Sequence, residues 1–402
     1  MPLTEAMPTG PGALAPPAGR RTLPYSRQQI DDDDVAAVIA ALRSDWLTTG
    51  PRVAEFEAAF AQATGAREAV ALSSGTAALH ATMAALDIGP GDEVIVPPLT
   101  FAASANCVVY QGGTPVFADV DPRTLLLDPA AVARKLGPRT RAVVAVDYAG
   151  QPCDYTALEA AVAGAGVSIV ADACHALGAS YRGRPAGTLA MLNAFSLHPV
   201  KPITTAEGGV VTTDDRLLAA RMRQFRNHGI ATDHRERERQ GAWTYDMTEL
   251  GFNYRLSDLQ CALGTSQLHK LPGWLERRRA LAARYDALLS AVSGITLVHR
   301  RPEVEHAYHL YVVQCDPARL TGGRDALVAG LRAEGIGATI HYPPVHLHSY
   351  YRARFGTAEG LCPVAEAAAG RVVTLPLFPA MDEADVDHVI ERLHVVLDRL
   401  AV

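Results

Sequence analysis

Between residues 69 and 213, short apolar runs rich in β-branched residues alternate with stretches of helical periodicity. This alternation limits the fold of the 402-residue chain more than any other feature, because strands separated by helices assemble into a mostly parallel sheet that helices cover. The predicted strands are Ala69–Leu72, Glu93–Val96, Pro115–Ala118, Ala142–Val146, Val167–Ala171, Ala194–Leu197 and Val210–Thr213. Together they fit one large α/β domain.

Helical periodicity continues on both sides of this region. Two helices are predicted before the first strand, one from about Ile30 to Leu42 and one around Val53 to Thr64. The acidic run from Asp31 to Asp34 lies where a helix N-terminus favours negative charge. A helix-rich and then mixed α+β region follows; its predicted elements are helices Leu256–Leu268 and Leu275–Leu289, strands near Tyr308–Cys315 and Ala338–His341, and a closing helix from Asp382 to about Leu400.

These patterns divide the chain into three parts. Residues 1–22 are rich in Pro, Gly and Ala, lack the pattern of a signal peptide, and are expected to form a disordered extension. Residues 23–270 are expected to form the large α/β domain, with its N-terminal segment packing on the small domain. Residues 271–402 are expected to form that smaller C-terminal α+β domain.

Charge and cysteine content restrict the partners. The formal net charge is −6 and no basic block is sustained, which argues against nucleic acid or an anionic membrane as a main partner. The six cysteines form no CxxC pair, as expected of reduced thiols rather than of a disulfide framework. No apolar stretch approaches the roughly 20 residues that a membrane helix needs. We therefore expect a cytoplasmic protein.

The segment from Ser73 to His80 stands where a predicted strand ends and a helix begins. Small residues such as Gly75 let backbone N–H groups approach an anion, and the helix dipole favours negative charge at that end. The segment is therefore a candidate phosphate site, although strand–glycine–helix turns are also common simply as turns.

Asp172 follows an apolar strand, so its carboxylate is expected at the edge where open α/β sheets bind ligands. A carboxylate there suits a protonated ring nitrogen, because it keeps the ring charged and able to draw electrons from a neighbouring carbanion. The alternative is a helix N-cap. His175 could pack beside such a ring, but it could also be structural.

Lys201 lies among apolar residues and prolines in the segment from Phe195 to Gly209. Burial disfavours the ammonium form and lowers a lysine's pKa, which suits an amine that bonds to a carbonyl carbon. Most lysines are solvated, but this stretch is poor in lysine and follows the other two candidate segments in order. Ser196 could offer its hydroxyl to a phosphate.

Three further groups leave alternatives open. Asn253 and Arg255 precede a helix, and composition alone makes them a turn and a capping pair. A metal site at the histidines of segment 341–348 is disfavoured, because no carboxylate or cysteine shares that segment. A hydrolytic role for Ser73 or Ser74 is disfavoured because no G-x-S-x-G elbow is present.

With these segments in view, the chain resembles the fold-type I enzymes of the DegT/StrS group of sugar-nucleotide aminotransferases, which use pyridoxal 5′-phosphate (PLP). The resemblance runs from about Leu23 to the C-terminus and is carried by the motifs SSGTAALHA, DACHALGA, SLHPVKPITTAEGG, GFNYRLSDLQCALG, HYPPVHLHSYY and LPLFPAM. It implies a PLP-transferase fold, in which a large, mostly parallel seven-stranded sheet domain precedes a smaller C-terminal α+β domain.

The resemblance also implies roles for individual residues. Lys201 matches the lysine that holds the cofactor as a Schiff base, and Asp172 matches the aspartate that pairs with the pyridine nitrogen. Phe101 matches the residue that stacks on the ring, and His175 a position that touches the cofactor's oxygen or face. Some members replace the lysine by histidine and dehydrate their substrates, so Lys201 favours transamination.

The phosphate contacts implied by the resemblance fall on Gly75, Thr76 and Ser196. In the family the asparagine of the NYR loop reaches the phosphate from the other subunit, which implies a homodimer and assigns that contact to Asn253.

Segments Pro24–Gln28, Ser44–Pro51, Gly150–Asp154 and His198–Pro202 are similar to the 4-aminotransferases of pseudaminic acid biosynthesis. Those enzymes act on UDP-linked 4-keto-6-deoxy-N-acetyl hexoses, which implies a nucleotide-sugar acceptor and an amino acid donor, glutamate. The alternatives are a cyclitol or aminohydroxybenzoate-type ketone, a PLP-binding regulator without turnover, and a plain α/β binding protein. No helix pair with a basic face is evident, which argues against the regulator.

Overall fold

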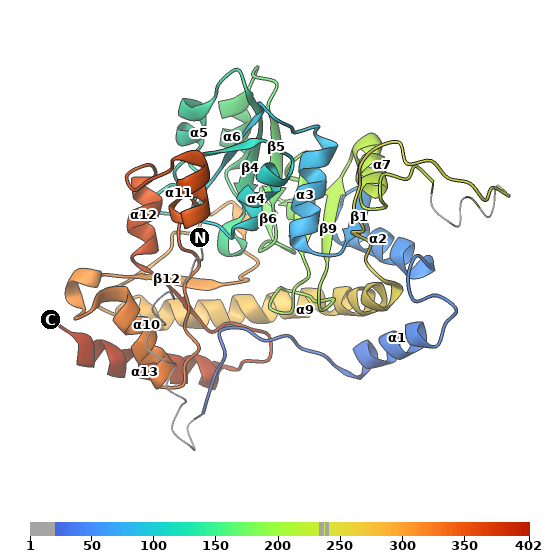
Figure 1. Cartoon of the computed structure of the whole chain (residues 1–402). Coiled ribbons are helices and arrows are strands. Elements are labelled where there is room, and N and C mark those ends of the chain that lie inside the picture. Colours follow the sequence, from blue (N-terminus) through green and yellow to red (C-terminus); the bar gives the residue numbers. More distant parts are fainter. Residues whose placement is uncertain (1–20, 233–236, 238–240) are drawn as a thin grey trace, which may run out of the picture.

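The computed structural model describes residues 21–232, 237 and 241–402 (Figure 1). The predicted extension, residues 1–22, lies outside the described residues except for its last two positions. The centre of the structure is a seven-stranded sheet with strand order β1-β9-β8-β5-β4-β2-β3. Its strands are β1 (Glu68–Leu72), β2 (Glu93–Val96), β3 (Thr114–Phe117), β4 (Thr140–Val146), β5 (Ser168–Asp172), β8 (Leu192–Ser196) and β9 (Gly209–Thr213).

The sheet confirms the predicted α/β fold. Strands β3, β2, β4, β5 and β8 are parallel to one another, and β9 is antiparallel to both β8 and β1. Each predicted strand has its counterpart, with ends displaced by two residues or fewer. The strands are buried on both faces, which explains why they appear in the sequence as continuous apolar runs rather than as alternating patterns.

Helices cover this sheet (Figure 1). They are α3 (Gly75–Ala85), α4 (Ala103–Tyr110), α5 (Pro129–Lys135), α6 (Tyr155–Val162) and α7 (Arg216–Phe225). Helix α3 packs against β8, β9, α4 and α7, and nearly all of its residues are buried. This burial holds the N-terminus of α3 at the carboxyl edge of the sheet.

One long helix, α9 (Asp258–Leu289), joins the two ends of the molecule (Figure 1). The prediction of two separate helices is wrong here, because α9 continues through Pro272. A proline inside a helix costs about 3 kcal/mol, and packing on both sides offsets this cost. The N-terminal half of α9 packs on α1 (Asp32–Leu42) and α2 (Pro51–Thr64), and its C-terminal half packs on α13 (Glu383–Leu400) and β10 (Ile295–Leu297).

Two hydrophobic cores meet along α9. Cys261, Leu268 and Leu275 belong to the core of the large sheet, whereas Leu281 and Leu289 belong to a second core. The boundary proposed at residue 270 therefore falls inside a helix that serves both cores. Leu23 is buried in the second core, and its N–H donates to the Gly335 carbonyl (2.9 Å).

The second core is built on an antiparallel sheet of order β10-β12-β13, in which β12 is Tyr311–Cys315 and β13 is Val372–Leu375. The predicted strand at Ala338–His341 is wrong, since only Thr339 pairs, with Thr374. Tandem prolines follow at 343 and 344 and cannot donate to a ladder. The predicted closing helix is α13, capped by Asp382. The remaining elements are α10 (Gly323–Ala333), α11 (Ser349–Phe355), α12 (Pro363–Ala369) and a small sheet of β6 (Ser180–Tyr181), β7 (Arg184–Pro185) and β11 (Val304–Glu305).

The segment after α10 returns to the large sheet. The Val345 N–H donates to the Pro98 carbonyl (2.8 Å), and the Tyr351 hydroxyl donates to Asn106 of α4 (2.6 Å). This return places residues 341 and 342 near the carboxyl edge of the sheet. No helix in the described part of the chain is long and apolar enough to span a bilayer.

Candidate active site

Asp172 is the last residue of β5 and lies at the carboxyl edge of the parallel strands. Its side chain is only 6% exposed. One oxygen, Oδ2, accepts a hydrogen bond from the Ser104 hydroxyl (2.6 Å), and Oδ1 accepts one from the Cys174 N–H (3.2 Å). The residues that follow form turns, so the alternative role as a helix N-cap is excluded.

Ser104 was not identified from the sequence. It lies in the first turn of α4, fully buried, and its Oγ is 2.6 Å from Oγ1 of the buried Thr100. Buried polar groups that are satisfied in such a network hold one orientation. The pair of hydroxyls therefore fixes the Asp172 carboxylate in place, with each oxygen still able to accept one further hydrogen bond.

Lys201 lies in the connection from β8 to β9, and β8 is the strand next to β5 in the sheet. Its side chain is partly buried. Burial lowers the pKa of the Lys201 amine, while the nearby Cys174 and Asp172 act in the opposite direction. A lowered pKa leaves more of the amine neutral and nucleophilic at pH 7. The structure thus brings Lys201 and Asp172 into the same site.

The turn from β1 into α3 lies against the end of β8. Ser74 caps the helix, because its hydroxyl accepts the Ala77 N–H (3.0 Å). The first N–H groups of a helix have no partner within it, and in α3 these belong to Gly75 and Thr76. A Cβ on Gly75 would lie 2.8 Å from Cβ of Ser196. The three predicted phosphate residues of this chain are therefore brought together.

We expect Gly75→Ala to weaken PLP binding by about tenfold or more, since the added methyl group must displace Ser196 and so widen the turn. Titration of the apoprotein with PLP measures this dissociation constant. Gly89→Ala is a matched control, because a Cβ there would meet nothing within 4 Å. Unchanged PLP affinity in Gly75→Ala would contradict a phosphate contact at this turn.

His175 and two aromatic residues form a wall beside Lys201. His175 is 6% exposed; its Nδ1 accepts the Ala149 N–H (3.3 Å), and its Nε2 lies 3.0 Å from the Tyr342 hydroxyl. Burial, aided by Lys201, lowers the pKa of His175 well below its ordinary value. The Phe101 ring lies 6.1 Å from that of Tyr342 and is 60% exposed, so much of its surface is uncovered.

The histidines of the C-terminal part of the chain have different surroundings. His341 is buried with its Nδ1 2.9 Å from the Thr374 hydroxyl, and burial lowers its pKa to about 3. His346 instead contacts Glu366 (2.9 Å). His309, which was not singled out from the sequence, lies 4.5 Å from His175 between ring centroids. Both His309 and His341 have their pKa lowered chiefly by burial and also by Lys201, so both lie near the Lys201 amine.

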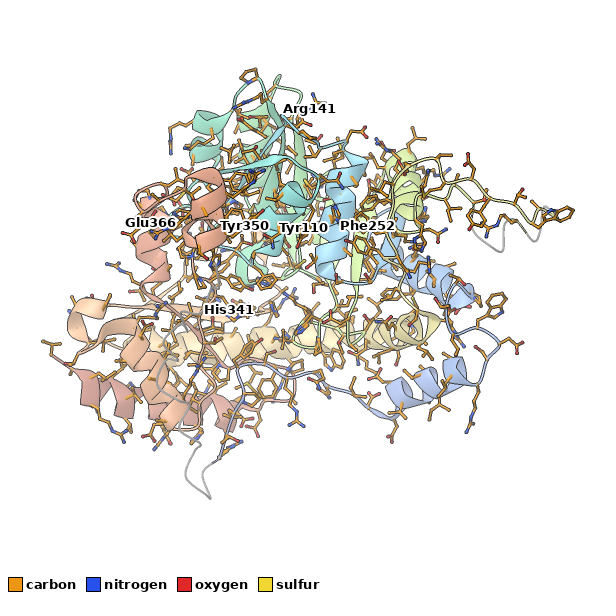
Figure 2. The ribbon with its side chains drawn as sticks, in the orientation of Figure 1. Tyr110, Arg141, Phe252, His341, Tyr350 and Glu366 are labelled. Atoms are coloured by element: carbon orange, nitrogen blue, oxygen red, sulfur yellow. The ribbon has the colours of Figure 1, made fainter. Side chains whose placement is uncertain are left out.

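Asn253 is exposed at the margin of the site. The carbonyl of the next residue, Tyr254, accepts the Ser73 N–H (2.8 Å), so the loop borders the turn into α3. The preceding residue, Phe252, lies near Tyr110 of α4 (Figure 2), and both rings are within 5.2 Å of the His80 ring. Phe252 and Tyr110 are 38% and 54% exposed, which leaves an uncovered aromatic surface next to Asn253.

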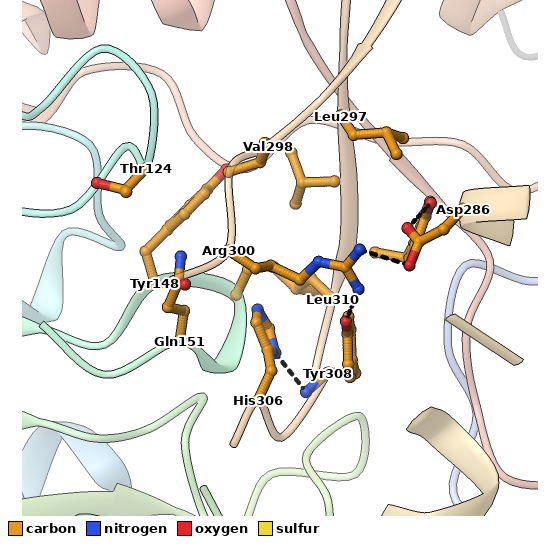
Figure 3. Close-up of a pocket in the computed structure, with 13 residues that line it drawn as sticks. Thr124, Tyr148, Gln151, Asp286, Leu297, Val298, Arg300, His306, Tyr308 and Leu310 are labelled. Carbon is orange, nitrogen blue, oxygen red and sulfur yellow. Dashed lines mark hydrogen bonds and ion pairs between the residues drawn. The ribbon is translucent and has the colours of Figure 1, made fainter. Parts of the chain in front are cut away.

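A separate small pocket is lined in part by Tyr148 and Ala149 of the turn that follows β4 (Figure 3). Its charged groups are already paired, since Arg300 contacts Asp286 (2.6 Å) and the Tyr308 hydroxyl. His306 is also engaged, because its Nδ1 accepts the Tyr308 N–H (2.8 Å). None of the site residues predicted from the sequence lines this pocket.

The groups around Lys201 fit PLP. The cofactor needs an amine for its aldehyde, an acceptor for its ring nitrogen and donors for its phosphate. Lys201 supplies a partly buried amine with lowered pKa, and Asp172 a buried carboxylate with an unused lone pair on each oxygen. The close approach of Gly75 to Ser196 leaves no room for a side chain where backbone donors meet a hydroxyl.

Comparison with known proteins gives matches over nearly the whole chain. The sequence model of the DegT/DnrJ/EryC1/StrS aminotransferase family matches residues 28–394. The spore coat polysaccharide biosynthesis protein SpsC of Bacillus subtilis (strain 168) is 40% identical over 377 residues, which cover 93% of this chain and 97% of that protein.

Two solved structures extend the comparison to the fold. Spr1654 of Streptococcus pneumoniae, described as a sugar aminotransferase and solved in its PLP-form, superposes with a TM-score of 0.88 at 31% identity, covering 95% of this chain and 100% of that one. PseC of Helicobacter pylori, an aminotransferase involved in the biosynthesis of pseudoaminic acid, gives a TM-score of 0.88 at 30% identity, covering 94% of this chain and 100% of that one.

Proposed function

The chain belongs to the DegT/DnrJ/EryC1/StrS aminotransferase family and is a PLP-dependent sugar aminotransferase; from this premise we propose that it moves an amino group from glutamate to a UDP-linked 4-keto-6-deoxy-N-acetyl hexose. The observation that supports amino transfer is the pairing of a lysine of lowered pKa with a buried carboxylate near the N-terminus of α3, and the choice of acceptor rests on the similarity to PseC.

Two relatives support a sugar as the acceptor. PseC, an aminotransferase involved in the biosynthesis of pseudoaminic acid, is 30% identical over 94% of this chain. SpsC, named for spore coat polysaccharide biosynthesis, is 40% identical. Both names refer to carbohydrate biosynthesis, in agreement with the segments at Pro24, Ser44 and Gly150 that are similar to pseudaminic-pathway 4-aminotransferases.

Lys201 and Asp172 would have different roles in the proposed reaction. When bound, PLP supplies an electron-withdrawing ring that stabilises negative charge on the carbon from which a proton is removed. Lys201 would hold the cofactor through its aldehyde, and its free amine would act as the base and acid that carries the proton at the donor's α-carbon. Asp172, held by Ser104, keeps the ring nitrogen protonated.

The phosphate contacts would hold the cofactor in the site while Lys201 acts as a free amine and no longer holds it. The N–H groups of Gly75 and Thr76 and the Ser196 hydroxyl would keep the phosphate in place at the N-terminus of α3. Lys201 would carry the proton in the same way when the sugar's ketone is the acceptor of the amino group.

A screen of keto-sugar acceptors tests the substrate. Purified protein with PLP and glutamate is incubated with UDP-linked 4-keto and 3-keto sugars and with a cyclitol ketone, and the products are identified by mass. We expect a gain of one amino group on the UDP-4-keto-6-deoxy-N-acetyl hexose. Amination of the cyclitol alone, or of no sugar nucleotide, would contradict the proposed acceptor.

We also propose that the active form is a homodimer in which Asn253 reaches the partner's phosphate site. Mixing Lys201→Ala chains with Asn253→Asp chains tests this. Asn253→Asp sets a negative charge against the phosphate, and Lys201→Ala lacks the catalytic amine. Each variant alone should therefore have low turnover. Mixed dimers, however, contain one site with both native residues, and recovery of about a quarter of native activity is expected. No recovery after verified subunit exchange would contradict an Asn253 contact between subunits.

A further inference from the structure

A second small pocket, distinct from that of Figure 3, has Lys201 in its wall and is lined by basic side chains. We call it the basic pocket, and its basic residues are Arg27, Lys201 and Arg278. None of its lining residues in the described part of the chain is acidic. A concave site that carries one sign of charge attracts ligands of the opposite sign, so this pocket suits an anion.

Arg278 brings a buried charge to the basic pocket. It lies on α9 and is 1% exposed, and its Nη1 donates to the carbonyls of Tyr308 (3.1 Å), His309 (3.4 Å) and Leu377 (2.9 Å). Its Nε is buried without a hydrogen-bond partner, and no carboxylate of residues 21–232, 237 and 241–402 pairs with it.

The charge of Arg278 persists at neutral pH. Burial lowers the pKa of its guanidinium, but only to about 10. The three carbonyls hold the group in place without neutralising it, and among the described residues Nη2 has no hydrogen-bond partner. Buried charges in proteins are normally paired. Arg278 therefore has both the charge and the free N–H groups to bind an anion that enters the pocket.

The wall around Arg278 leaves this charge uncompensated. Gln267 lies about three turns before Arg278 on the same face of α9. Its Nε2 donates to Asp34 (2.7 Å), and its Oε1 accepts the Thr204 N–H (3.4 Å). Asp34, the acid behind this wall, already pairs with the Lys270 ammonium (2.8 Å). The basic pocket therefore keeps its positive charge.

Arg27 supplies a second guanidinium at the exposed end of the basic pocket. Its side chain is exposed, and within the described ranges it has neither an ion pair nor a hydrogen bond. The neighbouring Ser26 donates to the Val200 carbonyl (3.2 Å), which ties this segment to the residue before Lys201. One buried and one exposed arginine thus line the same pocket as the reactive lysine.

Lys201 connects the basic pocket to the reaction. The charges of Lys201 and Arg278 both help to lower the pKa of His309, after burial, so both lie near its ring. The donor's amine must reach the same carbon that the Lys201 amine holds, so the donor's carboxylates lie within one amino-acid length of Lys201. Arginine binds a carboxylate through two parallel hydrogen bonds. Glutamate has two carboxylates, and the pocket has two arginines without an acidic partner.

We propose that the basic pocket binds the carboxylates of the amino donor, with the α-carboxylate on Arg278 and the side-chain carboxylate of glutamate on Arg27. The inference rests on the proposed function and adds the residues that select a dicarboxylic donor. Arg278 is held by three carbonyls, which suits the group beside the reacting carbon, because that group must keep one position. Arg27 is exposed, which suits the end of the side chain, because this end differs between amino acids.

Arg27→Gln tests the selection of the donor. The loss of the visible absorbance of the lysine-bound cofactor is followed in a single turnover with glutamate or with glutamine, which has the same length but no side-chain charge. We expect the native protein to prefer glutamate by about tenfold or more. Arg27→Gln should lose that preference, because its rate with glutamate falls while its rate with glutamine stays near native.

Calorimetric titration of the PLP-loaded protein with glutarate, a dicarboxylate without an amine, tests binding without turnover. Arg27→Gln should weaken glutarate binding by about tenfold. Arg67→Gln is the matched control, because Arg67 is exposed at the start of β1, at the edge of the sheet opposite the site, and does not line the basic pocket. It should bind glutarate as the native protein does.

Arg278→Lys tests the buried end of the pocket. Lysine keeps the charge and can donate to the carbonyls, but it lacks the planar pair of donors. We expect about tenfold weaker glutarate binding and slower reaction with both donors. If this variant does not fold, Arg27→Gln still decides the question, because Arg27 has no contact in the described residues that the substitution would break.

The results separate this inference from the proposed function. A native protein whose visible absorbance is lost with no amino acid refutes amino transfer. A native protein that reacts with glutamate, together with an Arg27→Gln variant of unchanged donor preference and glutarate affinity, overturns the carboxylate site. Native glutarate affinity in a folded Arg278→Lys protein, or an equal loss of affinity in Arg67→Gln, overturns it as well.

Discussion

Lys201→Ala is expected to abolish amino transfer and the visible absorbance of the lysine-bound cofactor, while the protein stays folded. In the proposed mechanism the substitution removes both the covalent attachment and the group that carries the proton, and general acid–base catalysis alone contributes about 10²–10⁴-fold in rate. Stability should be kept, because Lys201 lies in a connecting segment and its ammonium form is disfavoured there by burial. Turnover, absorbance spectra and thermal unfolding measure the three expectations.

Lys270→Ala is the matched control. The Lys270 ammonium contacts Asp34 (2.8 Å) and Asp31 at the start of α1, and neither carboxylate belongs to the candidate site. This variant should lose some stability but keep its spectrum and turnover. Substantial turnover in Lys201→Ala would end the assignment of Lys201 as the proton carrier.

The seven-stranded sheet could be predicted because its strands are buried on both faces. Runs such as Ala142–Val146 need no tertiary information, since a parallel strand between helices is apolar along its whole length. The break predicted near Pro272 was wrong because the cost of a proline is local, whereas the gain from packing α9 against α1, α2 and α13 depends on the whole fold.

The strand predicted at residues 338–341 failed because its environment is set by distant parts of the chain. Residues 338–341 have strand-like composition, but only Thr339 pairs with β13, because the chain then leaves the sheet to pack on Pro98 of the large domain. No local pattern encodes this return. The same return brings Tyr342 to His175, so the error in the fold and the omission of Tyr342 from the predicted site have one cause.

Candidate site residues at or after a strand end could be picked out from the sequence. Those that reach the site from a helix or from the C-terminal part of the chain could not. Asp172 and Lys201 stand at or after strand ends, where open α/β sheets bind ligands. Ser104 and His309 become visible only when α4 and the small domain are placed against β5. Thr100 and Ser104 lie four residues apart just after β2, but the sequence does not show that Ser104 reaches Asp172.

Asp172→Asn is expected to lower turnover in both half-reactions by about 10²–10⁴-fold, with little loss of stability. The amide has nearly the same shape, and Ser104 can change from donor to acceptor toward its nitrogen, so the local hydrogen bonds can still be made. What is lost is the negative charge that keeps the cofactor's ring nitrogen protonated. Single-turnover measurements with glutamate and with the amino acceptor test each half-reaction separately.

Asp119→Asn gives the contrasting case. Asp119 accepts the N–H groups of Val364 and Ala365 (both 2.9 Å) at the start of α12, so the amide should cost about 1 kcal/mol of stability and leave turnover near native. The two variants therefore separate a carboxylate that serves chemistry from one that serves a helix. Native turnover in a well-folded Asp172→Asn protein that still binds PLP would show that the ring nitrogen needs no anionic partner, and the role of Asp172 would then be reduced to packing.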